Sequence, residues 1–317
     1  MTVTNMNDQA LMDHATQSIT VGSKSFAAAS RLFDPVTRRS AVMLYAWCRH
    51  CDDVIDGQEA GHDATVLSEA ETLERLEALI AQTHAVYAGL PVEDPAFAAF
   101  KDVVYRHRIR QDYALAHLAG FAMDVSQREY LSIADTLEYC YHVAGVVGLM
   151  MAQVMDVSDE KTLDRACDLG LAFQLTNIAR DIVEDAAVGR CYLPADWLAE
   201  MGIPRDQLAS PQYRPQLAIL AQRLVDLAEP YYVSAQAGLA SLRWRSAWAV
   251  ATARAVYREI GVKVRDAGPR AWDSRQSTSK LDKLRLVISG AWHATTSRVR
   301  RYPERPKKLW HRPRRFY

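Results

Sequence analysis

The sequence contains two long stretches without proline. Prolines occur at positions 35, 91 and 95 and then not again before position 194. Because proline removes a backbone donor and clashes with the preceding turn, its absence over residues 36–90 and 96–193 permits long helices. Ala, Leu, Glu, Arg and Gln recur at helical spacing, and the alternation typical of strands is missing. The sequence therefore predicts an all-α protein.

Two of the predicted helices carry clusters of acidic residues. The first begins near Pro35 and runs to Gly57, where a glycine stop is expected, and the second runs from about Leu163 to Gly189. Further helices are predicted over residues 69–88, 95–118, 127–157, 214–241 and 245–266. No repeat period or low-complexity linker divides the series, so residues 1–297 are expected to form a single helical domain.

The remaining residues, 298–317, differ in charge from the rest of the chain. They hold nine Lys or Arg against one Glu, whereas residues 1–297 carry 29 basic and 37 acidic side chains. We expect a basic, flexible C-terminal tail that could meet an anionic surface such as lipid headgroups or RNA. A solvated end without a partner is the alternative.

The composition of the chain indicates in which cellular compartment the protein is expected. The chain is 49% hydrophobic and 24% charged, as expected of a folded protein with a sizeable core. Its longest apolar run, residues 143–152, is about half the length of a membrane span. Five cysteines are an odd and low number, and the first residues lack the charge and apolar stretch of a signal peptide. We expect a cytoplasmic protein.

The first acidic helix brings a tyrosine, an arginine and three aspartates onto one side. Tyr45, Arg49, Asp52, Asp53 and Asp56 occupy relative positions 0, 4, 7, 8 and 11. Side chains three or four residues apart are neighbours on a helix, so the three carboxylates share one patch.

The second acidic helix repeats this arrangement with two amides. Gln174, Asn177, Asp181 and Asp185 follow one another at spacings of three, four and four, and Arg180 lies among them. The last three polar groups could therefore hold one cation from consecutive turns of the helix.

Both clusters are costly to build. Each precedes a glycine, and the dipole at the end of a helix disfavours an anion by roughly 0.3–1 kcal/mol. A hard, oxygen-preferring cation such as Mg²⁺ turns the repulsion into binding and is typically shared between carboxylates and substrate phosphates. Arginine can fork onto the phosphate oxygens that the metal leaves free. The pattern thus favours a Mg²⁺–diphosphate site over the alternative of two solvated acidic faces.

The motifs resemble those of the squalene/phytoene synthase family. The resemblance rests on DDVID at 52–56, QLTNIARDIVED at 174–185 and RCYLP at 190–194. Three more segments are similar to its bacterial, phytoene-forming branch, namely GSKSF at 22–26, YAWCRHCDD at 45–53 and YCYHVAGVVG at 139–148. The likeness runs from about Ser18 to about Lys283.

The resemblance implies an isoprenoid-synthase helical bundle around a central cavity, with two acidic clusters facing each other across its mouth. The implied metal ligands, for Mg²⁺ with Mn²⁺ as a substitute, are Asp52, Asp56, Asn177, Asp181 and Asp185, with Asp53 in support. The implied catalytic residues are Asp52, Asp56, Asp181, Asp185 and Tyr141. The implied substrate-binding residues are Ser23, Ser25, Tyr45, Arg49, Gln174, Arg180 and Tyr257. Either Arg270 or Arg275 matches a further arginine of the family.

The implied reaction is a head-to-head condensation of two geranylgeranyl diphosphates through a cyclopropyl diphosphate, ending in loss of a proton. No NADPH, no nucleic acid and peripheral membrane contact are expected. The alternatives are a squalene or dehydrosqualene synthase using farnesyl diphosphate, a head-to-tail elongase or terpene cyclase, and a non-enzymatic helical scaffold that binds membranes or RNA.

A carbocation survives only where water is excluded, so the cavity should have an apolar and aromatic wall. VAGVVGLMM at 143–151 is the candidate wall, and Phe26, Phe173 and Tyr141 are candidate aromatics. Gly145 and Gly148 each cost roughly 1 kcal/mol in a helix relative to Ala, which predicts a close approach by a substrate tail or by another helix.

Overall fold

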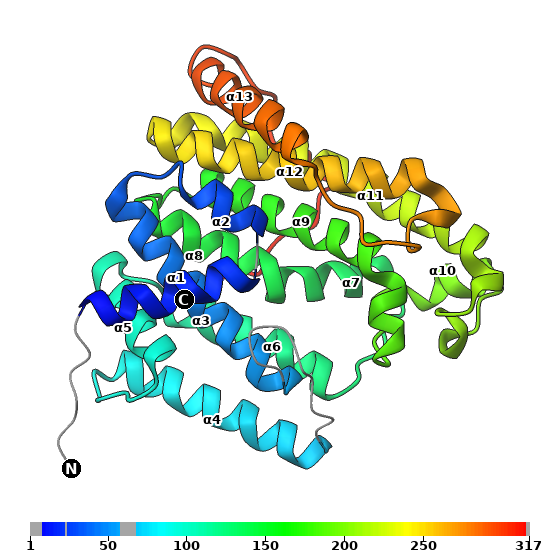
Figure 1. The fold of residues 1–317 in the computed structure, drawn as a ribbon, viewed down its shortest axis with the longest axis horizontal. Helices are drawn as coiled ribbons and strands as arrows, with labels where there is room; N and C mark the ends of the chain where they lie inside the picture. Colours follow the sequence, from blue (N-terminus) through cyan, green and yellow to red (C-terminus); the bar gives the residue numbers. More distant parts are fainter. Residues whose placement is uncertain (1–7, 23, 58–67, 315–317) are drawn as a thin grey trace.

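The computed structural model describes residues 8–22, 24–57 and 68–314, and every regular element in these ranges is a helix (Figure 1). The predicted all-α class is confirmed. The α-helices are α1 (Asp8–Gly22), α2 (Lys24–Ser30), α3 (Pro35–Asp56), α4 (Glu69–Tyr87), α5 (Pro95–His107), α6 (Gln111–Val125), α7 (Ile133–Cys140), α8 (Val146–Val154), α9 (Glu160–Ala187), α10 (Ala195–Glu200), α11 (Arg214–Gly238), α12 (Trp244–Ala267) and α13 (Lys280–Thr296). The π-helix η1 (Tyr141–Gly145) joins α7 to α8, and the short 3₁₀ turns are η2 (Arg205–Gln207), η3 (Pro211–Tyr213), η4 (Leu239–Ser241) and η5 (Gly268–Arg270).

The ends of α3 follow from its sequence. Asp34 accepts hydrogen bonds from the amides of Val36 and Thr37, both at 3.1 Å, and Pro35 occupies the first turn. Gly57 closes the helix in the left-handed conformation at φ 62°. The predicted helix from Pro35 to Gly57 is therefore confirmed.

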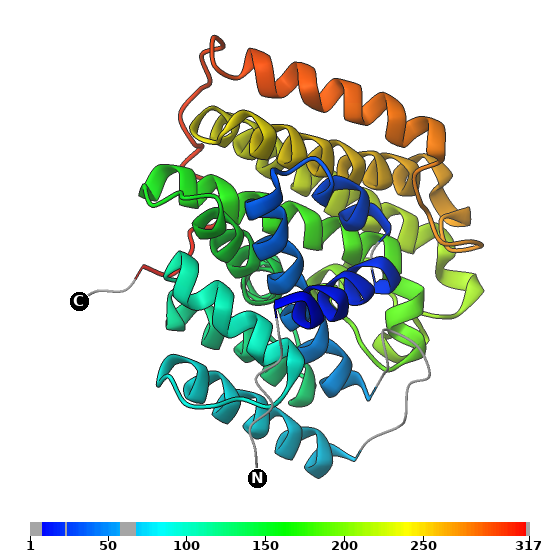
Figure 2. The ribbon, with the colours of Figure 1, turned by 60° about the vertical axis from the view of Figure 1, so that its left-hand side comes forward.

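Helix α9 is the central element of the bundle. Asp159 caps its first turn by accepting from the amide of Thr162 at 2.9 Å, and the helix begins at Glu160, three residues before the predicted start at Leu163. Figures 1 and 2 show α9 inside the bundle, with α11 and α12 on one side and α8 on the other. Any cavity beside α9 is thereby enclosed by other helices.

Two predicted helices are interrupted. The segment 95–118 is not one helix, because Arg108 adopts a left-handed conformation at φ 53° and separates α5 from α6. The segment 127–157 starts only at Ile133 and contains the π-turn η1. Local propensity does not predict either break, whereas α1, α2 and α13 are helices that the sequence analysis left out.

The glycines of α8 and η1 permit a close contact with α9. A Cβ atom added at Gly148 would lie 2.5 Å from the carbonyl oxygen of Ala166, and one at Gly145 would lie 3.1 Å from the sulfur of Cys167. Of the two predicted reasons for these glycines, the approach of a second helix is the one that the structure shows.

The basic C-terminal segment lies against the bundle. Arg305 pairs with Asp168, Arg312 pairs with Asp164 at 2.7 Å, and the amide of Trp310 donates to the hydroxyl of Tyr231 at 3.1 Å. These contacts are at odds with the free movement expected from composition, because basic side chains of the segment reach acidic groups on α9. The domain boundary at residue 297 stays a prediction. In the described ranges, no helix has the length and apolar character needed to cross a bilayer.

Candidate active site

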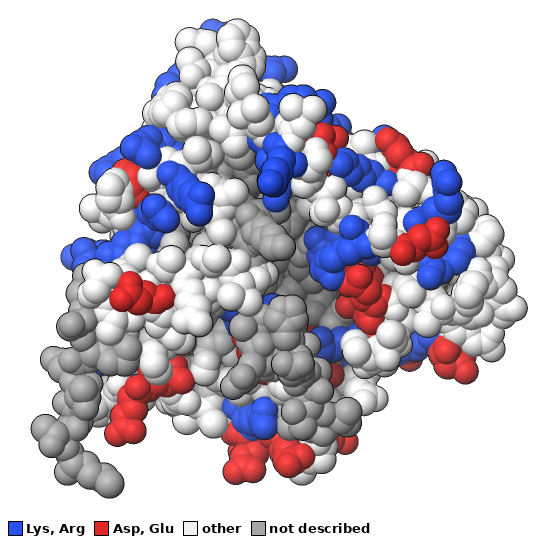
Figure 3. All heavy atoms as spheres, in the orientation of Figure 1, with Lys and Arg blue, Asp and Glu red and all other residues white. Residues whose placement is uncertain are grey.

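A cavity of about 910 Å³ lies beside α9, and Figure 3 shows a hollow in this face bordered on one side by neighbouring basic and acidic side chains. Its charged part is lined by Tyr45, Arg49, Asp52, Asp124, Gln174, Asn177, Arg180, Arg190, Tyr257 and Arg275. Its apolar part is lined by Phe26, Val143, Ala144, Val147, Met151, Leu169, Phe173, Ala249 and Ala253, among others. The predicted wall over 143–151 is therefore confirmed.

The cavity is long as well as large. Along α9 its lining residues extend from Arg180 near one end to Thr162 near the other. At 1.5 Å per residue, the 18 steps from Thr162 to Arg180 correspond to about 27 Å. The space is thus elongated, with the acidic clusters and their arginines at one end and mostly apolar groups over the remainder, where Arg165 also lines it.

The first acidic cluster is paired with an arginine of the same helix. Arg49 contacts Asp52 at 2.9 Å and Asp53 at 2.7 Å. Burial, followed by the nearby Asp56 carboxylate, raises the pKa of Asp52 to about 7. A cation bound beside Asp52 would favour the ionised carboxylate, which burial and Asp56 disfavour.

Arg190 links this cluster to the loop after α9. Its guanidinium donates to Asp56 at 3.3 Å, and a second, closer hydrogen bond joins the same two groups. Asp56 lines an adjoining cavity of about 460 Å³, and Arg190 lines both cavities. The RCYLP motif thus supplies a guanidinium at the charged end, a role that the sequence analysis did not assign to Arg190.

The second acidic cluster is also held by arginines. Arg180 donates from Nε to Asp181 at 2.7 Å, and Arg275 contacts the same carboxylate at 3.1 Å. Burial, followed by the charge of Asp181, raises the pKa of Asp185 to about 7. Arg275 lines the cavity whereas Arg270 does not, so Arg275 is the arginine that belongs to the site.

Asn177 carries an unsatisfied oxygen. Its side-chain Nδ2 donates to Gln174 at 3.2 Å, but its buried Oδ1 has no hydrogen-bond partner among the described residues. A buried amide oxygen without a partner costs free energy unless a ligand completes it. Its place on the cavity wall, one turn from Asp181, suits a cation ligand.

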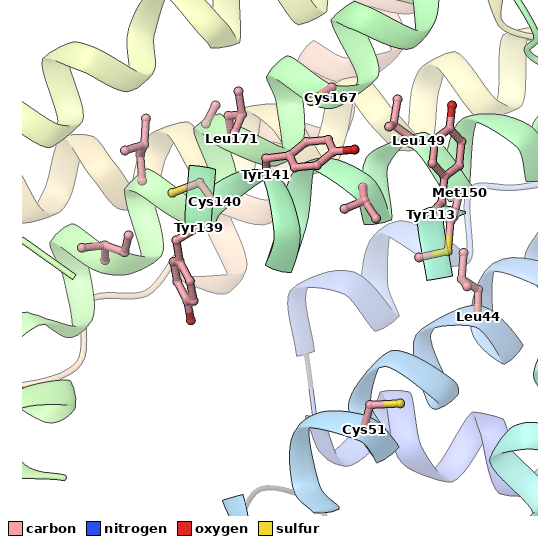
Figure 4. Packing of buried hydrophobic residues seen from close by; sticks show 14 of the residues in the cluster. Leu44, Cys51, Tyr113, Tyr139, Cys140, Tyr141, Leu149, Met150, Cys167 and Leu171 are labelled. Atoms are coloured by element: carbon pink, nitrogen blue, oxygen red, sulfur yellow. The ribbon is translucent and has the colours of Figure 1, made fainter. Parts of the chain in front are cut away.

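The predicted site residue Tyr141 lies away from the cavity, whereas Tyr139, to which the sequence analysis gave no role, lines it. Tyr141 is buried and does not line the cavity; its ring lies 5.4 Å from that of Trp310. Tyr139 lines the cavity instead, and Figure 4 shows that the two side chains leave the chain in different directions. The choice of Tyr141 as a site residue is therefore not supported by its position.

Tyr139 belongs to a polar group that the sequence analysis missed. Its hydroxyl donates to Asp124 at 3.2 Å, and the hydroxyl of Tyr192 donates to the same carboxylate at 3.0 Å. Burial raises the pKa of Asp124 to about 6. The one available signal was a lone acid in the otherwise apolar second half of α6.

Two stacked aromatic pairs each join a tyrosine of the charged part of the lining to a phenylalanine of the apolar part. Phe26 stacks on Tyr45 with ring centroids 5.2 Å apart, and Phe173 stacks on Tyr257 at 4.1 Å. All four side chains line the cavity. Aromatic faces of this kind stabilise cations without attacking them.

Two predicted residues cannot be placed. Ser23 lies outside the described residues, and of Ser25 only the backbone, in α2, is described. Within the described ranges, no three Asp, Glu, His or Cys side chains converge closely enough to hold a metal ion by themselves. The predicted metal ligands therefore stay a prediction, in which substrate oxygens must complete the coordination.

The fold and the cavity together define a helical enzyme with an apolar chamber and a charged mouth. The model of the squalene/phytoene synthase family matches residues 19–285, and the chain belongs to this family.

Relatives match this chain over nearly their whole length. The 15-cis-phytoene synthase of Pantoea ananas is 58% identical, covering 97% of this chain and 100% of its own. The 15-cis-phytoene synthase of Enterobacter agglomerans is 61% identical, covering 92% and 99%. A crystal structure of a dehydrosqualene synthase in complex with a ligand superposes with a TM-score of 0.81 at 27% identity, covering 91% and 98%.

Proposed function

We propose that this chain condenses two molecules of geranylgeranyl diphosphate head to head to give 15-cis-phytoene. The observation that carries the proposal is its identity of 58–61% to relatives named 15-cis-phytoene synthase over nearly the whole of both chains. The elongated cavity supports it, because a molecule with one charged head and a long apolar tail matches a space with one charged end.

The charged end is suited to Mg²⁺. The unpartnered Oδ1 of Asn177 and the raised pKa values of Asp52 and Asp185 mark a place where a cation would restore balance. The residues that would hold it are Asp52, Asp53, Asp56, Asn177, Asp181 and Asp185. When bound, the ion neutralises charge that develops on a departing diphosphate.

The arginines bind and orient the diphosphates. Arg49, Arg180 and Arg275 each pair with a carboxylate of the site. When a diphosphate binds together with its cations, the arginines can pair with phosphate oxygens and the carboxylates with the cations. One allylic diphosphate then ionises and releases inorganic diphosphate. The resulting cation is captured by the double bond of the second molecule, and ring closure with loss of a proton gives a cyclopropyl diphosphate. A second ionisation, a rearrangement and loss of a proton complete the reaction.

The cavity walls protect the carbocations. The stacked pairs formed by Phe26 with Tyr45 and by Phe173 with Tyr257 present aromatic faces beside the charged end. Beyond them the wall of α8 is apolar, so prenyl tails that fill the cavity would leave little room for water. The chain's own residues thus position the tails and exclude nucleophiles.

Incubation of the purified protein with Mg²⁺ and geranylgeranyl diphosphate tests this function. We expect phytoene without added NADPH, and an Asp52→Asn variant of unchanged circular dichroism should serve as the inactive control. Farnesyl diphosphate, with and without NADPH, tests the alternative suggested by the dehydrosqualene synthase structure. A C30 product in preference to phytoene would contradict the proposal.

The substrate is amphipathic and the product is wholly apolar, so we also propose peripheral contact with the cytoplasmic side of a membrane. Only such a contact would let the product leave the cavity without crossing water.

A further inference from the structure

Helix α13 exposes a row of large apolar side chains to solvent. Leu281, Leu284, Ile288 and Trp292 are exposed to 76%, 59%, 64% and 69%. Their spacings of three, four and four place them on one stripe of the helix. Because exposed apolar residues usually occur singly, a continuous stripe indicates a binding surface.

The opposite side of α13 is already buried. Leu286, Gly290 and Ala294 face α12, and a Cβ atom at Gly290 would lie 2.3 Å from Oγ1 of Thr252. Trp248 on α12 donates from its indole nitrogen to the carbonyl oxygen of Val287 at 2.8 Å. The helix is therefore fixed on the bundle, and its outer stripe is not needed for that attachment.

Basic residues surround this stripe. Residues 280–303 contain six Lys or Arg (Lys280, Lys283, Arg285, Arg298, Arg300 and Arg301) against Asp282 as the one acid. The Asp282 carboxylate pairs with Lys263 at 2.6 Å and accepts a hydrogen bond from the backbone amide of Ser279 at 2.9 Å. The protruding end at the top of Figure 3, which α13 forms in Figure 1, is white with blue along its sides. Positive charge beside an apolar face is typical of helices that lie in an anionic lipid interface.

The stripe lies close to the cavity. Thr278, just before α13, and Lys283 in its first turn both line the cavity. Ile260 of α12 lines it too and packs against the buried Leu286 of α13. A surface that held α13 at a bilayer would thus bring the cavity close to lipid.

We propose that the outer stripe of α13 is the membrane-docking surface of this protein and that its partner is an anionic bilayer. The proposal deepens the peripheral contact suggested above and rests on it. Charge selects the partner. Arg285 pairs with Glu259 of α12 at 3.1 Å, and a second copy would set the other five basic residues against five like charges, whereas anionic headgroups neutralise them.

The C-terminal tail is less suited to this role. Arg305 and Arg312 are engaged with Asp168 and Asp164 on α9, so their charges are not available to lipid headgroups. Charge alone had suggested residues 298–317 as the docking surface. The proposed surface instead covers residues 280–303 and shares with that segment only its first part, which includes Arg298, Arg300 and Arg301.

Vesicle flotation of the full-length protein tests the proposal. We expect binding to vesicles that contain phosphatidylglycerol, weakened by high salt, and little binding to pure phosphatidylcholine. An Ile288→Glu/Trp292→Glu variant should bind at least about tenfold more weakly, since two large side chains no longer enter the interface. Leu131→Glu is the matched control, because Leu131 is 63% exposed and precedes α7, away from α13.

Three results would overturn the assignment. They are equal vesicle binding by the double variant and the wild type, equal loss in the Leu131→Glu control, and a dimer of the wild type that the double variant disrupts without any change in flotation. Phytoene formation in detergent, measured on the same samples, is expected to stay within twofold in the double variant. Loss of the proposed activity is thereby distinguished from loss of docking.

Discussion

The guanidinium of Arg305 holds both carboxylate oxygens of Asp168, at 2.8 and 2.7 Å, although the two residues are 137 positions apart. Asp168 is fully buried on α9 and also accepts from the hydroxyl of Ser234. A charge in such a place is tolerated only when it is paired and hydrogen-bonded. The C-terminal segment therefore completes the electrostatics of the central helix.

Replacing Arg305 by Ala should destabilise the fold. It leaves a buried, unpaired carboxylate, and we expect the free energy of unfolding in urea to fall by about 3 kcal/mol. Lys308→Ala, at an exposed position of the same segment, should change it by less than about 0.5 kcal/mol. An Asp168→Asn/Arg305→Ala variant should lose less than the sum of the single changes; additive losses would contradict the pairing.

Asn177 should matter for metal dependence. Asn177→Ala removes the unpartnered oxygen, so the Mg²⁺ concentration that gives half-maximal activity should rise about tenfold or more while the circular dichroism stays unchanged. Glu77→Gln, on the exposed side of α4, is the control. An unchanged Mg²⁺ requirement in Asn177→Ala would show that this amide does not serve the ion.

Cavity length should set the preferred tail. Ala166 lines the cavity near the Thr162 end, so Ala166→Phe should shorten the space. We expect the ratio of C40 to C30 product, from equal amounts of geranylgeranyl and farnesyl diphosphate, to fall at least about tenfold, corresponding to about 1.4 kcal/mol. Ala78→Phe on exposed α4 should leave the ratio unchanged. A fall in both products with a constant ratio would indicate general disruption instead.

His117 should make stability depend on pH. It is buried and lines the cavity; burial lowers its pKa to about 4, from an ordinary value near 6.5. Below pH 6.5 the unfolded chain binds a proton that the folded one refuses, so stability falls as the pH drops from 6.5 to 4, by at most roughly 1.4 kcal/mol per unit.

Urea unfolding at pH 7, 6 and 5 checks this. His117→Gln should flatten the decline relative to the wild type, whereas His14→Gln, at an exposed position of α1, should leave it unchanged. Parallel curves for the wild type and His117→Gln would show that His117 is not the group responsible.

Much of the fold and of the charged mouth could be predicted because the signals are local. Proline spacing, the Asp34 cap and Gly57 define α3, and the three-and-four spacing of acids defines a stripe whatever surrounds it. Each of these interactions joins residues of one helix that are close in the sequence, so it can be recognised without knowledge of the packing. The family motifs pointed to the same two acidic clusters and also implied a role for each residue in them.

Other features depend on contacts between distant segments. Whether Tyr139 or Tyr141 faces the cavity depends on how η1 rotates against α9, and whether Arg270 or Arg275 reaches Asp181 depends on the path of the loop after α12. Neither choice can be predicted from the residues nearby in the sequence. The residues involved are ordinary for a helix or a loop.

The sequence by itself determined the helical class, the two acidic helices and the chemistry that their carboxylates and arginines favour. Only the tertiary structure decided that the basic C-terminal segment docks on α9 and that the outer side of α13 is left apolar. The physical reason is that burial belongs to the packed molecule: a charged or apolar side chain acquires its role only when other helices cover it or leave it exposed.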